Sequence, residues 1–333
     1  MKAAVVENAG QLVVRELPDP PMGKYEARCE MLYGSVCAGT DTHLLHFHVP
    51  FCYWMQMPFI LGHESVGRVV DTGEKVRHLK PGDLITRVGS PAVGGIHSGW
   101  GGFATTGIAS DWRAMQEDGI EGWTDKTVQQ ILPPDVDPAV GTLFITWRET
   151  LSYVMRMGIG QGKSVLVMGS GGNGLAFVSH ARNLGASRIV MVGAARRMAD
   201  GTRAGATETY DYRSAECWAA LENGFDFVID SVGTALNVAA GQKALKPGGT
   251  IGIYGLDEAG KVTLSPDKTF TFYNGHYDEA EAHEAVLRFY RNGELKADVW
   301  QVRDQEFSLT DIREALAAVE DRTLVKPLVR LSQ

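Results

Sequence analysis

Apolar residues follow two different patterns along the chain, and the change between them divides the sequence. Up to about residue 142, short apolar segments such as 27–32 and 65–70 alternate with turn residues such as Lys80-Pro81-Gly82-Asp83. This pattern is typical of a β-rich domain. Over 143–272, apolar runs of strand length alternate with longer segments of helical period, which predicts a parallel sheet covered by helices.

The second pattern fixes the expected domain organisation. Strands are predicted over 164–168, 188–192, 225–230 and 250–254, then helices over 278–291 and 309–316, and a closing strand over 326–331. Parallel neighbours need crossover helices between consecutive strands. We therefore expect an α/β protein in which residues 1–142, completed by 273–333, form one domain and residues 143–272 form another.

A glycine-rich turn follows the first strand of the parallel sheet. The strand 164–168 runs directly into G-S-G-G-N-G, and an apolar helix begins after it. In dinucleotide-binding proteins the first glycine makes the turn, the second lets the backbone approach the pyrophosphate, and the third lets helix and strand pack closely. The sequence predicts a Rossmann-type, doubly wound sheet whose cofactor contacts include Gly169, Gly171, Gly172, Asn173 and Gly174.

The end of the second predicted strand bears on the choice of cofactor. A free ribose 2′-hydroxyl is usually held by an acidic residue about 20 residues beyond the glycines. Here the strand ends in Gly193-Ala194-Ala195-Arg196-Arg197. Gly193 leaves room for a 2′-phosphate, and Arg196 and Arg197 are able to bind it, which favours NADP(H). The alternative is that the two arginines are solvated residues at the start of a helix.

Composition narrows the classes of partner. Across 333 residues the formal net charge is −8, with acids and bases mixed, which argues against nucleic acid as a partner. No apolar run reaches membrane-spanning length, and Met1 to Val6 resembles a strand rather than a secretion signal. The four cysteines are scattered without a C-x-x-C pair, which favours a reducing compartment. We expect a cytoplasmic protein.

Two segments of the first domain hold candidate metal ligands. Cys37 precedes Gly39-Thr40-Asp41-Thr42-His43, and His63 stands in Leu61-Gly62-His63-Glu64. A cysteine thiolate and an imidazole suit zinc, and a catalytic zinc needs three protein ligands with one position open. From the residues alone, a small buried cysteine and a hydrogen-bonded core histidine are the more common roles of these residue types.

Several motifs together resemble one enzyme family. They are G-T-D-T-H at 39–43, P-F-I-L-G-H-E-S-V-G-R-V-V at 58–70, K-P-G-D at 80–83, G-G-F-A at 101–104, the glycine turn, F-D-F-V-I-D-S-V-G at 225–233 and L-K-P-G-G-T at 245–250. Over nearly its whole length the chain resembles the zinc-dependent alcohol and polyol dehydrogenases of the medium-chain dehydrogenase/reductase type. The resemblance implies a GroES-like β-barrel beside the nucleotide-binding domain, a small-molecule alcohol or ketone as substrate, and a homodimer or homotetramer.

The resemblance also assigns roles to individual residues. Cys37 and His63 would be zinc ligands, and Glu64 an outer or exchanging ligand. Thr40 would hold the substrate hydroxyl and pass its proton towards solvent, with His43 as a further relay residue. Asp41 would orient the metal site, as carboxylates often do for ligating histidines.

The chain departs from the family pattern in three places. Ala38 and Gly39 both separate Cys37 from Thr40, where the family has one residue, so an ungapped alignment would put Ala38 in the ligand slot. Glu149 resembles the family's third ligand but stands about one helical turn nearer the strand; pairing with an arginine is its alternative role. Residues 89–100 hold no cysteine, so we expect one catalytic zinc and no structural zinc.

The segment 44–59, between the two metal motifs, is rich in aromatic residues. It is expected either to line the substrate pocket, which favours a bulky or apolar secondary alcohol or ketone, or to pack against another domain or subunit. The sequence and the resemblance together favour a zinc-dependent oxidoreductase that transfers hydride between NADP(H) and an alcohol or ketone, the alcohol being a secondary alcohol or a polyol. The alternatives are a zinc-free quinone or enone reductase of the same superfamily, and an NADPH-binding protein without catalysis.

Overall fold

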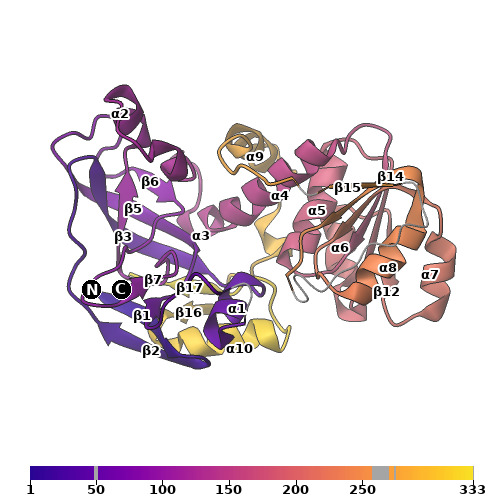
Figure 1. The fold of residues 1–333 in the computed structure, drawn as a ribbon, viewed down its shortest axis with the longest axis horizontal. Helices are drawn as coiled ribbons and strands as arrows, with labels where there is room; N and C mark the ends of the chain where they lie inside the picture. Colours follow the sequence, from indigo (N-terminus) through magenta and orange to yellow (C-terminus); the bar gives the residue numbers. More distant parts are fainter. Residues whose placement is uncertain (49–51, 257–269, 274, 333) are drawn as a thin grey trace. The chain divides into compact units, whose positions relative to one another are not determined.

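The computed structural model describes residues 1–48, 52–256, 270–273 and 275–332. The chain forms two compact units, one of Met1–Ile145 with Gln301–Gln333 and one of Thr146–Trp300 (Figure 1). The sequence pattern placed the boundaries at 142/143 and 272/273, whereas the structure groups helix α9 (His283–Arg291) with the second unit. Among the described residues, no helix combines the length and apolar character needed to cross a membrane.

The first unit is built from two sheets. One has the order β2-β1-β4-β7, and the other has the order β16-β17-β3-β5-β6-β9, with β8 also paired to β3. The strands are β1 (Lys2–Asn8), β2 (Gln11–Glu16), β3 (Glu26–Ser35), β4 (Phe59–Ile60), β5 (Glu64–Thr72), β6 (Leu84–Thr86), β7 (His97–Ser98), β8 (Thr106–Ser110), β9 (Gln130–Leu132), β16 (Glu306–Ser308) and β17 (Leu328–Arg330).

Alternation along these strands builds the core of the first unit. Ala27, Cys29 and Met31 of β3 are fully buried at every second position, as expected for a strand with one face inward. They join a cluster that includes Leu316 from the C-terminal part of the chain, so residues far apart in sequence share one core. The helices of this unit are α1 (Thr40–His46), α2 (Trp112–Glu117), α3 (Pro138–Gly141) and α10 (Ile312–Glu320), with 3-10 turns η1 (Trp123–Lys126) and η4 (Leu309–Asp311).

The second unit holds one sheet of parallel strands in the order β12-β11-β10-β13-β14-β15. The strands are β10 (Ser164–Met168), β11 (Arg188–Gly193), β12 (Glu208–Asp211), β13 (Phe225–Asp230), β14 (Leu245–Ile253) and β15 (Thr271–Tyr273). The order reverses between β10 and β13, and ligands of such sheets bind outside the carboxyl ends of the strands at that point.

Helices cover both faces of this sheet. The helices of this unit are α4 (Leu143–Met157), α5 (Gly172–Asn183), α6 (Met198–Ala204), α7 (Ala215–Leu221), α8 (Ala235–Ala244) and α9, with 3-10 turns η2 (Ala195–Arg197) and η3 (Ala297–Val299). Leu166 and Met168 of β10 lie in the cluster with Val238 of α8. Gly252 of β14 faces Tyr153 of α4 instead. The predicted α/β class, with a β-rich first unit and a doubly wound parallel sheet, is confirmed.

Candidate metal centre and cofactor site

Three neighbouring strands of the first unit bring distant residues to one place. Ser35, the last residue of β3, is paired with Glu64 of β5 on one side and with Leu328 of β17 on the other. Both pairings are antiparallel, so the end of β3 meets the beginnings of β5 and β17. Cys37, His63 and Lys326, which flank these strand ends, therefore lie at the same end of the sheet.

Cys37, His63 and Glu64 form a compact group of metal-binding side chains. Each offers one ligand atom, these atoms all lie within 4.8 Å of one another, and all three residues are buried. Zinc lies about 2.0–2.3 Å from sulfur, nitrogen and oxygen ligands. The donors are therefore close enough to close on one ion, and sulfur, imidazole and carboxylate donors together suit zinc.

Asp41 ties the two halves of this group together. It is fully buried on α1, and its Oδ1 lies 2.9 Å from Nδ1 of His63. Its Oδ2 accepts a hydrogen bond of 2.8 Å from the backbone N–H of Cys37. Because Asp41 occupies Nδ1, Nε2 of His63 remains to face the site, where it lies 3.7 Å from Oε1 of Glu64.

Burial and charge act in opposite directions on His63. Burial by itself lowers the pKa of the imidazole, but the Asp41 carboxylate and the nearby Cys37 raise the pKa of His63 well above its ordinary value. An ion bound at Nε2 requires that nitrogen to be deprotonated, so metal binding at this centre would release a proton.

Lys326 is part of the centre, and sequence reasoning missed it. Its Nζ lies 2.5 and 2.6 Å from the two carboxylate oxygens of Glu64, and both residues are almost completely buried. Burial lowers the pKa of Lys326, but the negative charge of Cys37, Glu64 and Asp41 outweighs it and raises the pKa above its usual range. A lysine before Pro327 resembles the exposed end of a strand; only the pairing of β17 with β3 reveals its position.

Helix α1 carries the two residues assigned to proton transfer. Thr40 is its first residue and His43 stands three residues later, so both lie on one face of the helix. Both side chains are half-buried, whereas Asp41 on the opposite side is fully buried. The helix thus connects the candidate metal centre with the surface.

Two tryptophan rings lie one after the other beside the candidate metal centre. The Trp100 ring lies 5.6 Å from the His63 ring, and the Trp54 ring lies 5.2 Å from that of Trp100 in an edge-to-face arrangement. Their exposed fractions, 42% and 45%, leave both available to a ligand. Sequence reasoning identified the aromatic segment 44–59, of which residues 49–51 lie outside the described residues, but it missed Trp100. The isolated aromatic in Gly99-Trp100-Gly101-Gly102 was the available signal.

The glycine turn of the second unit has the geometry of a dinucleotide loop. Gly169 follows β10 with a φ of 114°, in the region that favours glycine. A Cβ on Gly174 would collide with the backbone of Gly169, so the helix packs directly on the turn. A Cβ on Gly171 would meet no atom within 4 Å. Gly171 is also the N-cap of α5, and it offers no side-chain acceptor to the first N–H groups of the helix. The open space and the N–H groups at the start of α5 suit a pyrophosphate.

The end of β11 combines a close packing contact with positive charge. A Cβ on Gly193 would collide with the side chain of Ser170, whose Oγ accepts a hydrogen bond of 3.1 Å from the Ala194 N–H. Position 193 therefore needs glycine because the Ser170 side chain fills the space that a Cβ would take. The sequence did not reveal this reason. Arg196 is exposed, whereas Arg197 is half-buried and binds Asp200 at 3.2 Å.

An aromatic and basic pair at the same edge of the sheet was not foreseen from the sequence. The Tyr212 N–H donates to the Gly193 carbonyl at 3.0 Å, which places Tyr212 beside the end of β11. The Arg213 guanidinium lies 5.3 Å from the centre of the Tyr212 ring. Such a pair offers a flat surface and a charge to an adenosine phosphate.

Glu149 lies on α4 and belongs to the second unit from Thr146 onward. Its side chain is 8% exposed, and its carboxylate accepts a hydrogen bond of 3.1 Å from the Tyr254 hydroxyl, just beyond β14. Ligation of a metal by Glu149 stays a prediction.

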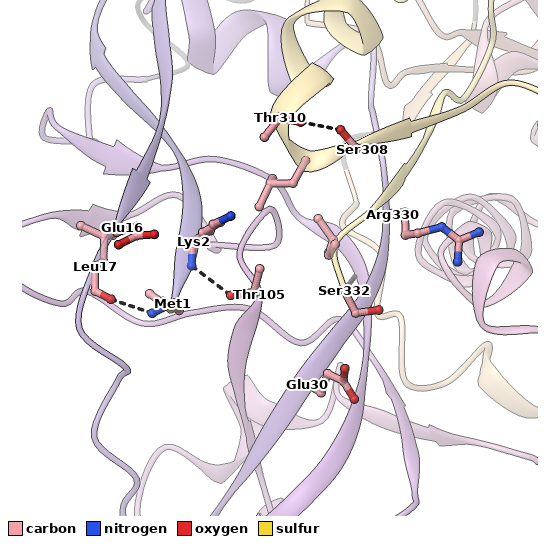
Figure 2. Close-up of a pocket in the computed structure, with 12 residues that line it drawn as sticks. Met1, Lys2, Glu16, Leu17, Glu30, Thr105, Ser308, Thr310, Arg330 and Ser332 are labelled. Carbon is pink, nitrogen blue, oxygen red and sulfur yellow. Dashed lines mark hydrogen bonds between the residues drawn. The ribbon is translucent and has the colours of Figure 1, made fainter.

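The first unit also contains a hollow of about 750 Å³ that is lined by none of the predicted site residues (Figure 2). Its charged lining residues include Lys2, Glu16 and Arg330, and Arg330 is bound to Glu306 at 2.5 Å. Within the hollow, the Lys2 N–H donates to Thr105 Oγ1 at 3.0 Å. This hollow has no part in the metal centre.

Comparisons with known proteins match a segment in each of the two units. The alcohol dehydrogenase GroES-like domain matches residues 23–119, and the zinc-binding dehydrogenase family matches residues 172–276. The chain is 27% identical to the geraniol dehydrogenase of Castellaniella defragrans, over 82% of this chain and 83% of the relative. It is 27% identical to the L-threonine 3-dehydrogenase of Bacillus velezensis, over 81% of each.

A solved structure from Sinorhizobium meliloti, described as a zinc-binding dehydrogenase bound to NADP, matches with a TM-score of 0.82 and 25% identity, over 99% of this chain and 98% of that one. The predicted family is confirmed. The chain is an oxidoreductase of the medium-chain dehydrogenase/reductase family, of the zinc-binding alcohol dehydrogenase type.

Proposed function

We propose that this protein transfers hydride between NADP(H) and an alcohol or ketone with the help of one catalytic zinc. The buried group of Cys37, His63 and Glu64 carries the proposal, because its donors suit zinc and lie within 4.8 Å of one another. Glu149 would supply a further protein donor. The absence of cysteine from residues 89–100 supports the expectation that no structural zinc is bound.

Residues of the chain would orient the metal ligand, carry the substrate proton and hold the cofactor. Bound zinc would act as a Lewis acid towards the substrate oxygen. Asp41 holds the His63 ring in the orientation that leaves Nε2 free for a ligand. Thr40 would accept a hydrogen bond from the substrate hydroxyl and pass the proton along α1 to His43. The glycine turn would hold the pyrophosphate, so that the cofactor is positioned for hydride transfer.

Metal and cofactor analysis of the purified protein tests this proposal. We expect about one zinc per chain by mass spectrometry, tighter binding of NADPH than of NADH, and NADPH oxidation with a panel of ketones. A metal-free protein that retains full turnover on quinones or enones would instead support the zinc-free reductase. NADPH binding without turnover on any substrate would support the non-catalytic alternative. Light scattering would test the expected homodimer or homotetramer.

The exposed arginine at the end of β11 provides a test of cofactor choice. Replacing Arg196 with alanine is expected to raise the KM for NADPH about 10- to 100-fold, the loss of one charge-assisted contact, and to leave the KM for NADH unchanged. Steady-state kinetics with both cofactors measure the effect. Arg203→Ala is the matched control, because Arg203 is also exposed but binds Asp298 at 2.7 Å. Equal changes for both cofactors would contradict a 2′-phosphate contact.

The tryptophan beside His63 provides a test of substrate class. We propose a bulky apolar or aromatic alcohol, since Trp100 and Trp54 would form an aromatic wall next to the metal. Trp100→Ala is expected to raise the KM for cinnamyl alcohol about 10-fold and to change that for 2-propanol little, because only the larger alcohol covers the indole. Trp123→Ala, in the separate stacked pair with Trp112, is the control. A similar change for both alcohols would argue against the wall.

A further inference from the structure

The end of helix α1 brings two histidines together. Phe47 follows the helix with a φ of 54°, in the left-handed region that glycine usually fills at this point. The Phe47 N–H donates to the Leu44 carbonyl at 3.2 Å, and the His48 N–H donates to the His43 carbonyl at 2.9 Å. This pair of bonds is the Schellman motif, which folds the second residue after the helix back onto the last turn. His48 is thereby returned to His43.

The side chains of these two histidines are in contact. Nδ1 of His43 lies 3.1 Å from Nδ1 of His48, and the rings meet edge to face with centroids 5.2 Å apart. A hydrogen bond between two such nitrogens requires that one carries the proton and the other accepts it. The ring that donates through Nδ1 keeps its Nε2 as a proton acceptor, and the ring that accepts at Nδ1 carries its own proton on Nε2.

The burial of the residues along and after α1 indicates the direction in which a proton would move through the two histidines. Thr40 and His43, three residues apart on one helix face, are half-buried, whereas His48 is exposed. A path that begins at Thr40 therefore reaches the surface at His48. An imidazole can take up a proton at one ring nitrogen while it releases another from the second nitrogen, so two imidazoles in series can move a proton without moving themselves.

We propose that His48 is a positioning residue of the proton path, which acts through His43 and delivers the substrate proton to solvent. The proposal rests on the function proposed above. In alcohol oxidation, the proton that leaves through Thr40 is taken up at Nε2 of His43. The Nδ1 proton of His43 passes to Nδ1 of His48, and the Nε2 proton of His48 passes to water. One proton enters and one leaves, and both rings end neutral.

Two neighbouring residues contact the paired histidines but take no part in the hydrogen bond between them. The His46 ring stacks on the His48 ring, with centroids 5.6 Å apart, and its Nε2 lies 2.7 Å from Glu320 of α10. The Cys52 thiol donates to the His43 carbonyl at 3.2 Å. His46 therefore anchors α1 to α10, and it offers a control residue of the same type on the same helix.

The first test needs no turnover. In the zinc-loaded protein labelled with ¹⁵N-histidine, nuclear magnetic resonance reports which ring nitrogen of each histidine carries the proton. We expect opposite Nδ1 states in His43 and His48, and we expect His48→Ala to shift the His43 nitrogens while His46→Gln leaves them in place. His43 resonances that are the same in His48→Ala and in the unaltered protein would overturn the pairing.

The second test measures the path itself. With cinnamyl alcohol and NADP⁺, His48→Ala is expected to lower kcat about 10-fold, a modest share of the usual contribution of proton transfer, with the KM unchanged. Added imidazole should restore the rate in His48→Ala, which a purely structural defect would not allow. His46→Gln should keep full kcat. An equal loss in His46→Gln, or no rescue by imidazole, would overturn the relay.

The two tests separate the relay from the proposed function. If the unaltered protein holds zinc but oxidises no alcohol, the proposed function and the relay both fail, while the resonance data still decide whether the histidines are paired. If the protein is active and His48→Ala matches it in kcat, the relay alone fails.

Discussion

Cys37→Ser is expected to remove both the zinc and the activity of this protein while NADPH still binds. A hydroxyl is a poor zinc ligand compared with a thiolate, and the change is nearly isosteric. The hydrogen bond from the backbone of residue 37 to Asp41 does not involve the sulfur and should survive. Lewis-acid stabilisation contributes several kcal/mol, so we expect turnover to fall about 10³-fold or more. Zinc content, NADPH fluorescence and kcat are the measurements.

A second cysteine provides the control for this experiment. Cys217 is also buried, but it belongs to the core on one face of the parallel sheet in the other unit. Cys217→Ser should therefore keep its zinc and its turnover, whatever it costs in stability. If Cys37→Ser retained a full zinc complement and normal turnover, Cys37 would not be the ligand, and the ungapped alignment that puts Ala38 in the ligand slot would hold instead.

Local patterns in the sequence were sufficient for the parallel sheet. Strands β10 and β13 begin and end at the predicted bounds, 164–168 and 225–230, because each is a mostly apolar segment bounded by glycine or polar residues. Strand β14 begins at Leu245 rather than at the predicted residue 250, and helix α9 begins at His283 rather than 278. Element ends depend on caps and pairing partners, which periodicity does not reveal.

The candidate site was harder to predict from the sequence, because the register of the paired strands determines which side chains meet there. The motifs with Cys37 and His63 were visible, but their closeness follows from the pairing of Ser35 with Glu64. Lys326 lies 262 residues from Glu64 along the chain, and no local pattern connects them. A shift in register by one residue would turn these side chains to the other face.

Gly193 illustrates a different limit of prediction from the sequence. The sequence favoured a role for this glycine in making room for a 2′-phosphate, yet the structure shows that the side chain of Ser170 already needs that space. Both reasons predict glycine at the same position, so the residue alone cannot distinguish them. The proposed preference for NADP(H) therefore depends on the charge of Arg196 and on the Tyr212–Arg213 pair.

Lys326→Met is expected to destabilise the first unit by about 3–5 kcal/mol, because it leaves the Glu64 carboxylate buried without its partner. The methionine fills the volume of the lysine stem, so lost packing contributes little. Urea unfolding followed by tryptophan fluorescence measures the effect. The double variant Lys326→Met/Glu64→Gln removes both charges and should recover most of the loss.

The Lys326–Glu64 pair is best tested by comparing zinc-saturated with metal-depleted protein. A bound divalent cation would compensate the Glu64 carboxylate in place of the lysine, so the cost of Lys326→Met should be larger in metal-depleted protein than in zinc-saturated protein. The same cost in both states would mean that Glu64 and the metal do not share a site. A cost below about 1 kcal/mol in the depleted state would mean that Lys326 does not balance a buried charge.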